Sequence, residues 1–455
     1  MHHDIPDKIL SIYRQFEKAG FEIYFVGGCV RDIILKKNIK DWDFTTNATP
    51  EEILKLFPDG FYDNQFGTVG IPIEDGNKQI VEITTYRTEH GYIDRRHPKK
   101  VSWGKTINDD LSRRDFTINA IALQLNPKHY TLSPSIVDPF NGQEDLKNKI
   151  IRAIGDPKKR FKEDALRLLR AIRFTSQLSF TIDEKTWIEI TKDAPLIKEI
   201  SGERIRIEIL RILESEYPYE GMMLLRNSSL MEYIFPELIE GIGVSQVRPG
   251  RHHTEDVFTH NMLSLKFCPS TDSIVRFSTL LHDAGKPKVA SVDEKGLVIF
   301  YNHELAGAKI ARVICNRLKF SKKDREKIVN LIRWHMFTVD EKITDAAVRR
   351  FIRRVGIENV KDMMDLRIGD RLGGGTQTAE SWRLKLFKKR VEDQLKPAPF
   401  SINDLAIDGN DIMKVLNIKP GPKIGEILQK LFEEVDEDLS KNNKDYLLKQ
   451  IKVLA

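Results

Sequence analysis

The chain carries a glycine pair and a carboxylate pair at a spacing that suits metal-dependent phosphoryl transfer. An apolar segment at residues 23–26 is followed directly by Gly27 and Gly28. Asp41 and Asp43 lie on the next extended segment. Residues i and i+2 of a strand point to the same face, so both carboxylates can hold one hard cation. The glycine turn offers backbone N–H groups to a phosphate. Either motif alone is more often a plain turn or a solvated strand edge, but together they predict a nucleotidyl-transfer site.

A third carboxylate, Glu82, lies in the apolar segment 81–87. A lone glutamate in such a segment usually faces solvent from an edge strand. Beside Asp41 and Asp43 it would complete the oxygen set of a two-metal site. One ion would lower the pKa of an attacking hydroxyl, and the other would neutralise a triphosphate and its pyrophosphate leaving group.

Two adjacent arginines and an acid follow, at Arg113, Arg114 and Asp115. A charge cluster at a helix end is one interpretation of this run. Beside a triphosphate, the arginines would act as phosphate clamps, and Asp115 would accept a hydrogen bond from a ribose 2′-OH.

The segment 160–170 predicts one helix with Arg160, Asp164 and Arg167 in a polar stripe. The simpler interpretation is an intrahelical ion pair worth about 0.2–0.5 kcal/mol. However, Asp164 only accepts and Arg167 only donates hydrogen bonds. Cytosine and adenine present an amine donor beside a ring-nitrogen acceptor, whereas uracil and guanine present a carbonyl beside a ring N–H. The pair would therefore accept C and A and reject U and G without a nucleic-acid template.

The elements that position these residues form an α+β head. Residues 87–110 are polar and turn-rich, which predicts a long functional loop. Helical periodicity dominates from residue 147 onward. In the head we predict helices at 6–19 and 30–35, strands at 23–26 and 42–45, a hairpin from 70–73 and 79–85, and a buried segment at 117–124. We predict four domains, a head at 1–150, a neck and body at 151–244, a metal-binding domain at 245–372 and a tail at 373–455.

Composition restricts the class of protein. The 455 residues carry a formal net charge of +6, which permits a nucleic-acid partner. The three cysteines have no paired spacing, so neither a disulfide framework nor a zinc ribbon is indicated. The N-terminus lacks an apolar signal core, and no run reaches the ~18 apolar residues of a membrane span. These features predict a soluble, cytoplasmic protein with no membrane partner.

Taken together, the motifs resemble those of class II tRNA nucleotidyltransferases and bacterial poly(A) polymerases, in the family's order over about the first half of the chain. They are Gly27-Gly28-x-Val30-Arg31-Asp32, Asp41-x-Asp43, Arg113-Arg114-Asp115-Phe116-Thr117-x-Asn119-Ala120, Glu163-Asp164-x-x-Arg167 and Gly202-Glu203-Arg204-Ile205-Arg206-x-Glu208. The resemblance implies a polymerase-β-like nucleotidyltransferase head followed by all-α neck, HD and tail domains that hold tRNA. It also implies addition of CCA to tRNA 3′ ends from CTP and ATP with Mg²⁺.

By this resemblance, Asp41 and Asp43 bind the catalytic Mg²⁺ with support from Glu82. The implied nucleotide-binding residues are Gly28, Arg31, Arg114, Asp115, Asp164, Arg167 and Arg170. In the family, the motif at 202–208 is a structural support of the neck. The segment around 94–96 resembles the flexible loop that helps the switch from C to A, which argues against an enzyme that adds only CC. An A-adding enzyme or a poly(A) polymerase shares nearly every motif and stays an alternative.

A second set of metal-type residues lies in the middle of the chain and resembles the HD phosphohydrolase pattern. Any one of these histidines alone would more often be a packed or surface residue. The set suits Mn²⁺, Ni²⁺, Fe²⁺ or Co²⁺. By resemblance, one metal is bound by His260, His282, Asp283 and Asp370, and a second is completed by His303 and His335.

His252 and His253 are alternatives to His260 as the first ligand. The HD resemblance implies hydrolysis of 2′,3′-cyclic phosphates or 2′-nucleotides. An HD phosphohydrolase with an inactive, RNA-binding head is therefore the alternative from another functional class.

Overall fold

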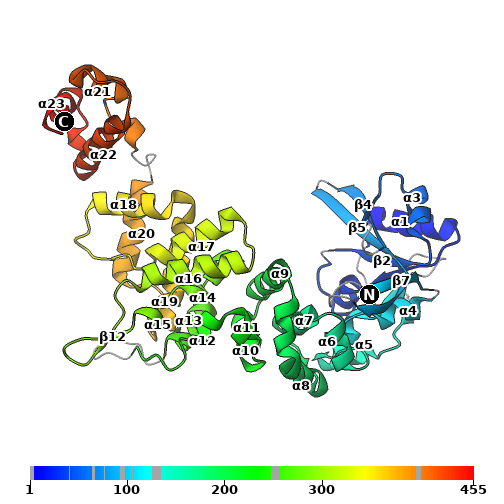
Figure 1. The fold of residues 1–455 in the computed structure, drawn as a ribbon. Helices are drawn as coiled ribbons and strands as arrows, with labels where there is room; N and C mark the ends of the chain where they lie inside the picture. The colour runs from blue at the N-terminus through cyan, green and yellow to red at the C-terminus, as the bar shows by residue number, and fades with distance from the viewer. Residues whose placement is uncertain are drawn as a thin grey trace. The chain divides into compact units, whose positions relative to one another are not determined.

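The computed structural model describes residues 5–39, 41–63, 67–75, 77–92, 98–104, 106–125, 135–246, 256–395 and 401–454. The chain divides into two compact units, Met1–Ile239 with Arg317–Lys319, and Glu240–Asn316 with Phe320–Ala455. Figure 1 shows the large sheet in the blue and cyan part of the chain and helices in most of the remainder. Among the described residues, no helix is both long enough and apolar enough to cross a membrane.

Seven strands form the sheet of the first unit, in the order β3-β4-β5-β2-β1-β8-β9. β2 and β5 pair in parallel, and the other neighbours pair antiparallel. The predicted strand at 23–26 and the predicted hairpin are confirmed, although Gly76 at the hairpin turn lies outside the described residues. The strands are β1 (Ile23–Val26), β2 (Asp43–Thr46), β3 (Phe61–Asp63), β4 (Thr68–Asp75), β5 (Asn77–Thr85), β8 (Ala122–Gln124) and β9 (Ser135–Val137).

Helices connect these strands and cover the sheet. Thr106 and Asp109 form a capping box that starts α4, with Asp109 N donating to Thr106 Oγ1 at 3.3 Å and Thr106 N donating to Asp109 Oδ2 at 3.1 Å. Ile107 and Leu111 of α4 then pack into the core of the head. The helices are α1 (Asp7–Lys18), α2 (Gly28–Ile34), α3 (Pro50–Leu56), α4 (Ile107–Ser112) and α5 (Gly142–Asn148).

Alternation along β1 and β2 separates an aromatic face of the sheet from a carboxylate face. Phe25 pairs in register with Phe44, and their ring centroids lie 4.5 Å apart. Tyr13 of α1 stacks on Phe25, so α1 covers this face. Because successive strand residues point to opposite faces, Asp43 lies on the other face, where its register partner Glu82 joins it.

The prediction of a long loop at 87–110 is wrong. Two strands, β6 (Arg87–Tyr92) and β7 (Pro98–Trp103), pair antiparallel there and form a separate two-stranded sheet. Backbone pairing between the two segments satisfies the N–H and C=O groups that face each other, a contribution that polar composition does not reveal. Residues 94–96, which resemble the family's flexible loop, lie outside the described residues.

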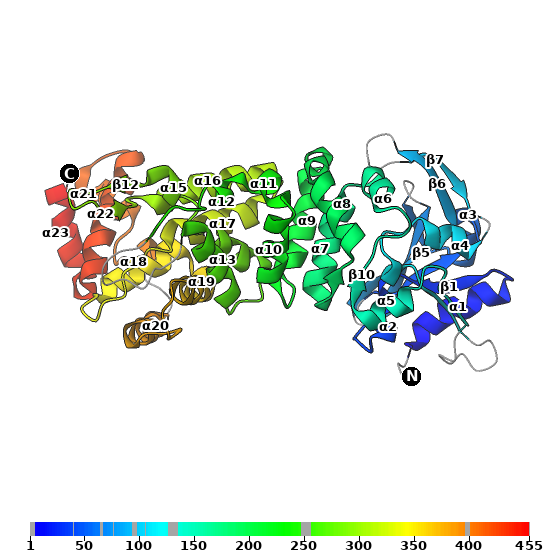
Figure 2. The same ribbon diagram turned by 90° about the horizontal axis from the view of Figure 1, so that it is seen from below.

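After the head, the first unit is mainly helical. α7 and α9 lie side by side in Figure 1 and Figure 2. A buried ion pair joins them, with Arg173 Nε donating to Glu208 Oε2 at 2.6 Å. The helices are α6 (Pro157–Glu163), α7 (Leu166–Leu178), α8 (Glu184–Asp193), α9 (Gly202–Leu213), α10 (Pro218–Asn227), α11 (Leu230–Ile234) and α12 (Pro236–Ile239).

The second unit has its own cores. One core lies among α17, α18, α19 and α20, and another lies among the tail helices α21, α22 and α23. Its helices are α13 (Val257–Phe267), α14 (Ser273–Leu281), α15 (Lys286–Val289), α16 (His303–Arg317), α17 (Lys322–Trp334), α18 (Asp345–Val355), α19 (Val360–Gly373), α20 (Trp382–Gln394), α21 (Gly409–Leu416), α22 (Pro422–Glu437) and α23 (Lys444–Leu454). The predicted fold class, an α+β head followed by helical domains, is confirmed.

Candidate functional site

The glycine turn lets an arginine and a carboxylate approach the same point of the backbone. Gly27 has a φ of +72°, which glycine adopts without steric cost. A Cβ on Gly27 would lie 3.1 Å from Arg114 Nη1 and 3.5 Å from Asp43 Oδ2. A side chain at position 27 would therefore displace the groups that the site needs.

The three predicted metal-binding carboxylates influence one another electrostatically. Burial raises the pKa of Asp43 to about 6, the Arg114 guanidinium opposes the shift, and Glu82 and Asp41 add to it. Asp41 is exposed and precedes β2, which begins at Asp43 and overlaps the predicted strand at 42–45. A divalent cation would relieve the repulsion among these carboxylates.

A pocket of about 480 Å³ opens beside Asp43. Arginines outnumber aspartates in its lining, an excess of positive charge that suits a triphosphate. The pocket brings together all the predicted nucleotide-binding residues, whereas Asp41 and Glu82 are not among its lining residues. The charged lining residues are Arg31, Arg113, Arg114, Arg167, Arg170, Arg173, Arg204, Arg211, Asp43, Asp115 and Asp164.

Asp115 is held as an ionised acceptor in this pocket. Arg170 donates to Asp115 Oδ2 from Nε at 2.7 Å, and Phe116 N donates to Oδ1 at 2.8 Å. Burial alone would raise the pKa of Asp115, but the neighbouring Arg170 and Arg167 and a hydrogen bond from Asn119 lower it to about 2. Asp115 is therefore suited to accept a hydrogen bond from a sugar hydroxyl.

Sequence reasoning missed Asp110, which orients the arginine pair. Its carboxylate is fully buried and accepts hydrogen bonds from Arg113 Nη2 at 2.6 Å and from Arg114 Nη2 at 3.1 Å. The spacing of an acid at i with arginines at i+3 and i+4 was the available signal, because such residues meet on one side of a helix end.

The predicted continuous helix across Asp164 is also wrong. α6 ends at Glu163, Asp164 is extended with φ −146° and ψ 105°, and α7 begins at Leu166. Asp164 Oδ1 accepts from Leu166 N at 3.0 Å, a local bond that competes with helical hydrogen bonding. Arg167 Nη1 donates to Glu163 Oε2 at 2.6 Å, and Asp164 and Arg167 both still line the pocket.

Arg204 of α9 is a second residue that sequence reasoning left out of the site. Its Nη1 and Nη2 donate to the two oxygens of Asp164 at 3.2 Å and 2.7 Å. Arg204 also lines the pocket itself. Arg204 lies 40 positions after Asp164, so the sequence gave no indication that these two side chains pair.

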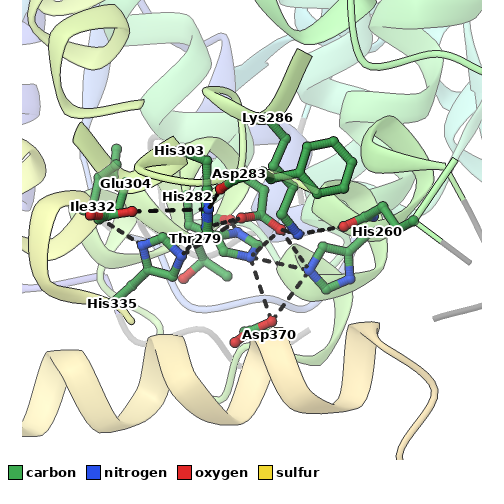
Figure 3. Close-up of polar contacts among 12 residues, drawn as sticks. His260, Thr279, His282, Asp283, Lys286, His303, Glu304, Ile332, His335 and Asp370 are labelled. Carbon is green, nitrogen blue, oxygen red and sulfur yellow. Dashed lines mark hydrogen bonds and ion pairs between the residues drawn. The ribbon is translucent and has the colours of Figure 1, made fainter. Parts of the chain in front are cut away.

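The second unit brings the six predicted HD residues together, with the buried carboxylate of Asp283 between the histidines (Figure 3). Asp283 Oδ2 lies 3.3 Å from His260 Nε2 and 3.4 Å from His282 Nε2. Its Oδ1 lies 3.3 Å from His303 Nε2 and 3.6 Å from His335 Nε2. The two oxygens of Asp283 thus face two separate histidine pairs.

Asp370 joins the first of these pairs, with Oδ1 at 3.3 Å from His260 Nε2 and 3.6 Å from His282 Nε2. His252 and His253, the alternative ligands, lie outside the described residues. The ligand atoms of His260, His282 and Asp283 lie within 4.8 Å of one another, and so do those of Asp283, His303 and His335. The described carboxylates of the head form no such compact cluster.

Backbone carbonyls orient three of the four histidines for metal binding. Nδ1 of His282 lies 2.8 Å from Thr279 O, Nδ1 of His303 lies 2.8 Å from Phe300 O, and Nδ1 of His335 lies 2.7 Å from Ile332 O. A proton on Nδ1, donated to the carbonyl, leaves Nε2 as the ligand atom. This arrangement fits a divalent metal better than an ordinary buried histidine cluster does.

The charges of the cluster are strongly coupled. Burial lowers the pKa of His260, but the hydrogen bonds to Asp283 and Asp370 and the charges of these carboxylates together raise it to about 9. Burial raises the pKa of Asp283, but His282 and Lys286 hold it well below its usual range. Lys286 pairs directly with Asp283, a partner that sequence reasoning did not identify.

Three family models match successive parts of the chain. The "Poly A polymerase head domain" model matches residues 23–152, and the "Probable RNA and SrmB- binding site of polymerase A" model matches residues 179–241. A model for "tRNA nucleotidyltransferase domain 2" matches residues 289–451.

Curated relatives and a solved structure extend this similarity. The CCA-adding enzyme of Lactobacillus helveticus is 46% identical over 230 residues, which are 50% of this chain and 55% of that protein. The CCA-adding enzyme of Limosilactobacillus reuteri is 30% identical over an alignment that covers 98% of this chain and 96% of that protein.

The crystal structure of the Bacillus stearothermophilus CCA-adding enzyme in complex with CTP shares the fold. Its TM-score is 0.70 at 24% identity, over 98% of this chain and 96% of that one. The family resemblance read from the motifs is therefore confirmed. Because the similarity to the Limosilactobacillus reuteri enzyme runs over nearly the full length of both proteins, this chain belongs to the CCA-adding enzyme family.

Proposed function

We propose that the protein adds C, C and A to the 3′ ends of tRNA from CTP and ATP without a nucleic-acid template. The observation that carries the proposal is the arginine-lined pocket that contains Asp43 together with Asp164 and Arg167. Relatives named CCA-adding enzymes support the same reaction, as does a family member of Thermotoga maritima solved with tRNA_CCA.

Asp41, Asp43 and Glu82 would hold Mg²⁺, whose chemistry would be to activate the terminal hydroxyl of tRNA and to neutralise the triphosphate. Glu82 and Asp41 help to raise the pKa of Asp43, a repulsion that fits a site for a divalent cation. The tRNA 3′ oxygen forms a bond to the α-phosphorus, and the bond from that phosphorus to the pyrophosphate breaks.

The remaining pocket residues bind and orient the nucleotide. Arg31 and Arg114 would hold phosphate oxygens, and Asp115 with Arg170 would hold the sugar end. Asp164 accepts from the exocyclic amine of C or A, while Arg167 donates to the adjacent ring nitrogen.

Substitution of the metal-binding aspartates tests this proposal. Asp43→Ala and Asp41→Ala should each abolish incorporation of labelled CTP and ATP into tRNA that lacks CCA. Asp7→Ala removes the same charge from an exposed position on α1 and should retain incorporation. Undiminished incorporation by Asp43→Ala would refute the assignment.

The number and order of additions separate CCA addition from its nearest alternatives. Each nucleotide is offered separately with tRNA that ends at the discriminator base, at C or at CC. A CCA-adding enzyme extends all three in order, an A-adding enzyme extends only the CC end, and a poly(A) polymerase continues past one A.

In this proposal the helical segments that follow the head also contact tRNA, in addition to the contact of its 3′ end with the head. We assign residues 151–244 to the neck and body, 245–372 to the HD domain and 373–455 to the tail. Trp382 at the start of α20 is 58% exposed and carries the Arg383 guanidinium 5.3 Å from its ring centroid. An exposed aromatic residue beside an arginine suits stacking on RNA and contact with phosphate.

The geometry around Asp283 favours a second activity, metal-dependent phosphohydrolysis. His260, His282, Asp283 and Asp370 would hold one ion and His303 and His335 would complete a second with Asp283, where Mn²⁺, Ni²⁺, Fe²⁺ or Co²⁺ would supply an activated water. The proposed substrates are 2′,3′-cyclic phosphates and 2′-nucleotides.

Release of phosphate from these substrates, measured with each metal in turn, tests the second activity. Asp283→Asn should remove it and Asp43→Ala should not. If hydrolysis alone is measurable in the wild-type protein, the alternative of an HD phosphohydrolase with an inactive head is correct.

A further inference from the structure

We propose that Arg204 of α9 is a specificity-determining positioning residue, which orients the Asp164 carboxylate for selection of C and A over U and G. The inference rests on the proposed template-independent addition and assigns a role to a residue outside the predicted site. It also revises the view that the motif at 202–208 serves only to support the neck.

Arg204 holds Asp164 by both carboxylate oxygens. Nη1 donates to Oδ1 at 3.2 Å and Nη2 donates to Oδ2 at 2.7 Å, the paired geometry that fixes the plane of a carboxylate. Leu166 N adds a third donor, 3.0 Å from Oδ1. Three donors on one carboxylate leave it little freedom to rotate.

Asp164 needs this restraint because it lies outside a helix. Its extended backbone separates α6 from α7, so no helical hydrogen-bond pattern determines its side-chain direction. The side chains of Arg204 and Asp164 are 21% and 19% exposed, and both line the pocket. The contact is thus formed at the pocket wall, where a bound base would meet the carboxylate.

The remaining acceptor positions on Asp164 determine which base is accepted. A carboxylate has about four lone-pair positions, and the three donors occupy three of them. The one that remains, on Oδ2, accepts the exocyclic amine of C or A. A carbonyl of U or G would instead face a negative oxygen that cannot donate. If the carboxylate rotated, this distinction would weaken.

The fold anchors the helix that carries Arg204. A Cβ on Gly202 would lie 2.2 Å from Arg317 O, so only glycine allows the start of α9 to lie against that backbone segment. The buried Arg173–Glu208 pair ties the next turn of α9 to α7. The start of α9 is therefore fixed relative to the base-reading residues, as a positioning role requires.

Competition between nucleotides tests the proposal on the full-length protein. The measured quantity is the ratio of kcat/KM for CTP or ATP to that for UTP or GTP. The tRNA ends at the discriminator base or at C when CTP is the correct nucleotide, and at CC when ATP is. Arg204→Gln should reduce this ratio by about ten- to a hundredfold, the effect of losing a hydrogen bond to a charged group. Arg204→Lys keeps the charge but not the two paired guanidinium donors, and it should give an intermediate ratio.

Arg211→Gln is the matched control, since Arg211 lies on the same helix and lines the same pocket. It should change KM for correct and incorrect nucleotides alike and leave the ratio unchanged. A merely structural role for Arg204 would lower kcat/KM equally for all four nucleotides, and that result would overturn the proposal. If Arg204→Gln fails to fold, a wild-type ratio in Arg204→Lys would overturn it as well.

Failure of the proposed function gives a different result. Wild-type protein would then add neither C nor A to tRNA, and the proposed function and this inference would both be wrong. Normal addition by the wild-type protein with an unchanged ratio in both Arg204 variants refutes this inference alone.

Discussion

Single buried carboxylates in this protein take their charge state from the cations beside them. Asp115 pairs with Arg170 in the nucleotide pocket, and Asp283 pairs with Lys286 and the histidines of the second unit. Each pair keeps a buried carboxylate ionised, as a hydrogen-bond acceptor or metal ligand must be.

Asp115 should make the stability of the head depend on acidic pH. Its pKa is about 2 in the folded protein against 3.8 ordinarily, so folding favours the ionised form. The resulting stabilisation, about 2 kcal/mol, is complete above pH 4 and is lost as pH falls toward 2. Denaturant unfolding of the head at several pH values measures it, and Asp115→Asn should flatten the dependence in that range. An equally steep dependence in the variant would contradict the assignment.

Metal binding at the HD cluster should release a proton. His260 has a pKa of about 9, so it carries a proton at neutral pH before an ion binds. Binding of Mn²⁺ should release about one proton and weaken as pH falls, because metal ligands must be deprotonated. Calorimetry in buffers of different ionisation enthalpy measures the release. His260→Gln should largely abolish the buffer dependence, and a binding heat that is the same in every buffer with the wild-type protein would count against this account.

At the scale of elements, the turns and helix ends decide where the chemical groups lie. The turn at Gly27 brings backbone to the pocket, and the break at Asp164 and the end of α4 deliver side chains to it. Helical periodicity predicted the helices well because their buried faces repeat along the chain. It did not predict the break at Asp164, since a bond from that side chain to Leu166 N replaces helical pairing there.

Asp110, the buried carboxylate of α4, should affect nucleotide affinity more than turnover. Asp110→Asn leaves Arg113 and Arg114 without their buried anion, so we expect a loss of about 3 kcal/mol in stability and a raised KM for CTP and ATP. Chemical denaturation and steady-state kinetics measure the two effects. Asp109→Asn, in the capping box of the same helix, should cost about 1 kcal/mol or less and leave KM near wild type. A lower kcat at unchanged KM in Asp110→Asn would contradict the positioning role.

At the scale of the whole molecule, the two units have separate cores and separate candidate sites. The nucleotide pocket is lined only by residues of the first unit, and the HD cluster lies only in the second. Ligands that bind one folded unit stabilise that unit by mass action.

Calorimetric unfolding should therefore show two transitions with different ligand dependence. CTP with Mg²⁺ should raise the transition of the first unit, and Mn²⁺ at low concentration should raise that of the second. Asp283→Asn should remove the response to Mn²⁺ without removing the response to CTP. One transition that both ligands raise in parallel would show that the two units unfold together.

The sequence by itself determined the family, the fold class and the residue types of both sites, because motif order and hydrophobic periodicity are properties of neighbouring residues. Only the tertiary structure decided which partners those residues meet. Asp164 and Arg204 lie 40 positions apart, and their contact depends on the packing of α9 beside α7. Asp283 likewise meets His260, His303 and His335, which come from three other segments, only when the second unit has folded. Long-range contacts of this kind are set by packing, which local sequence does not encode residue by residue.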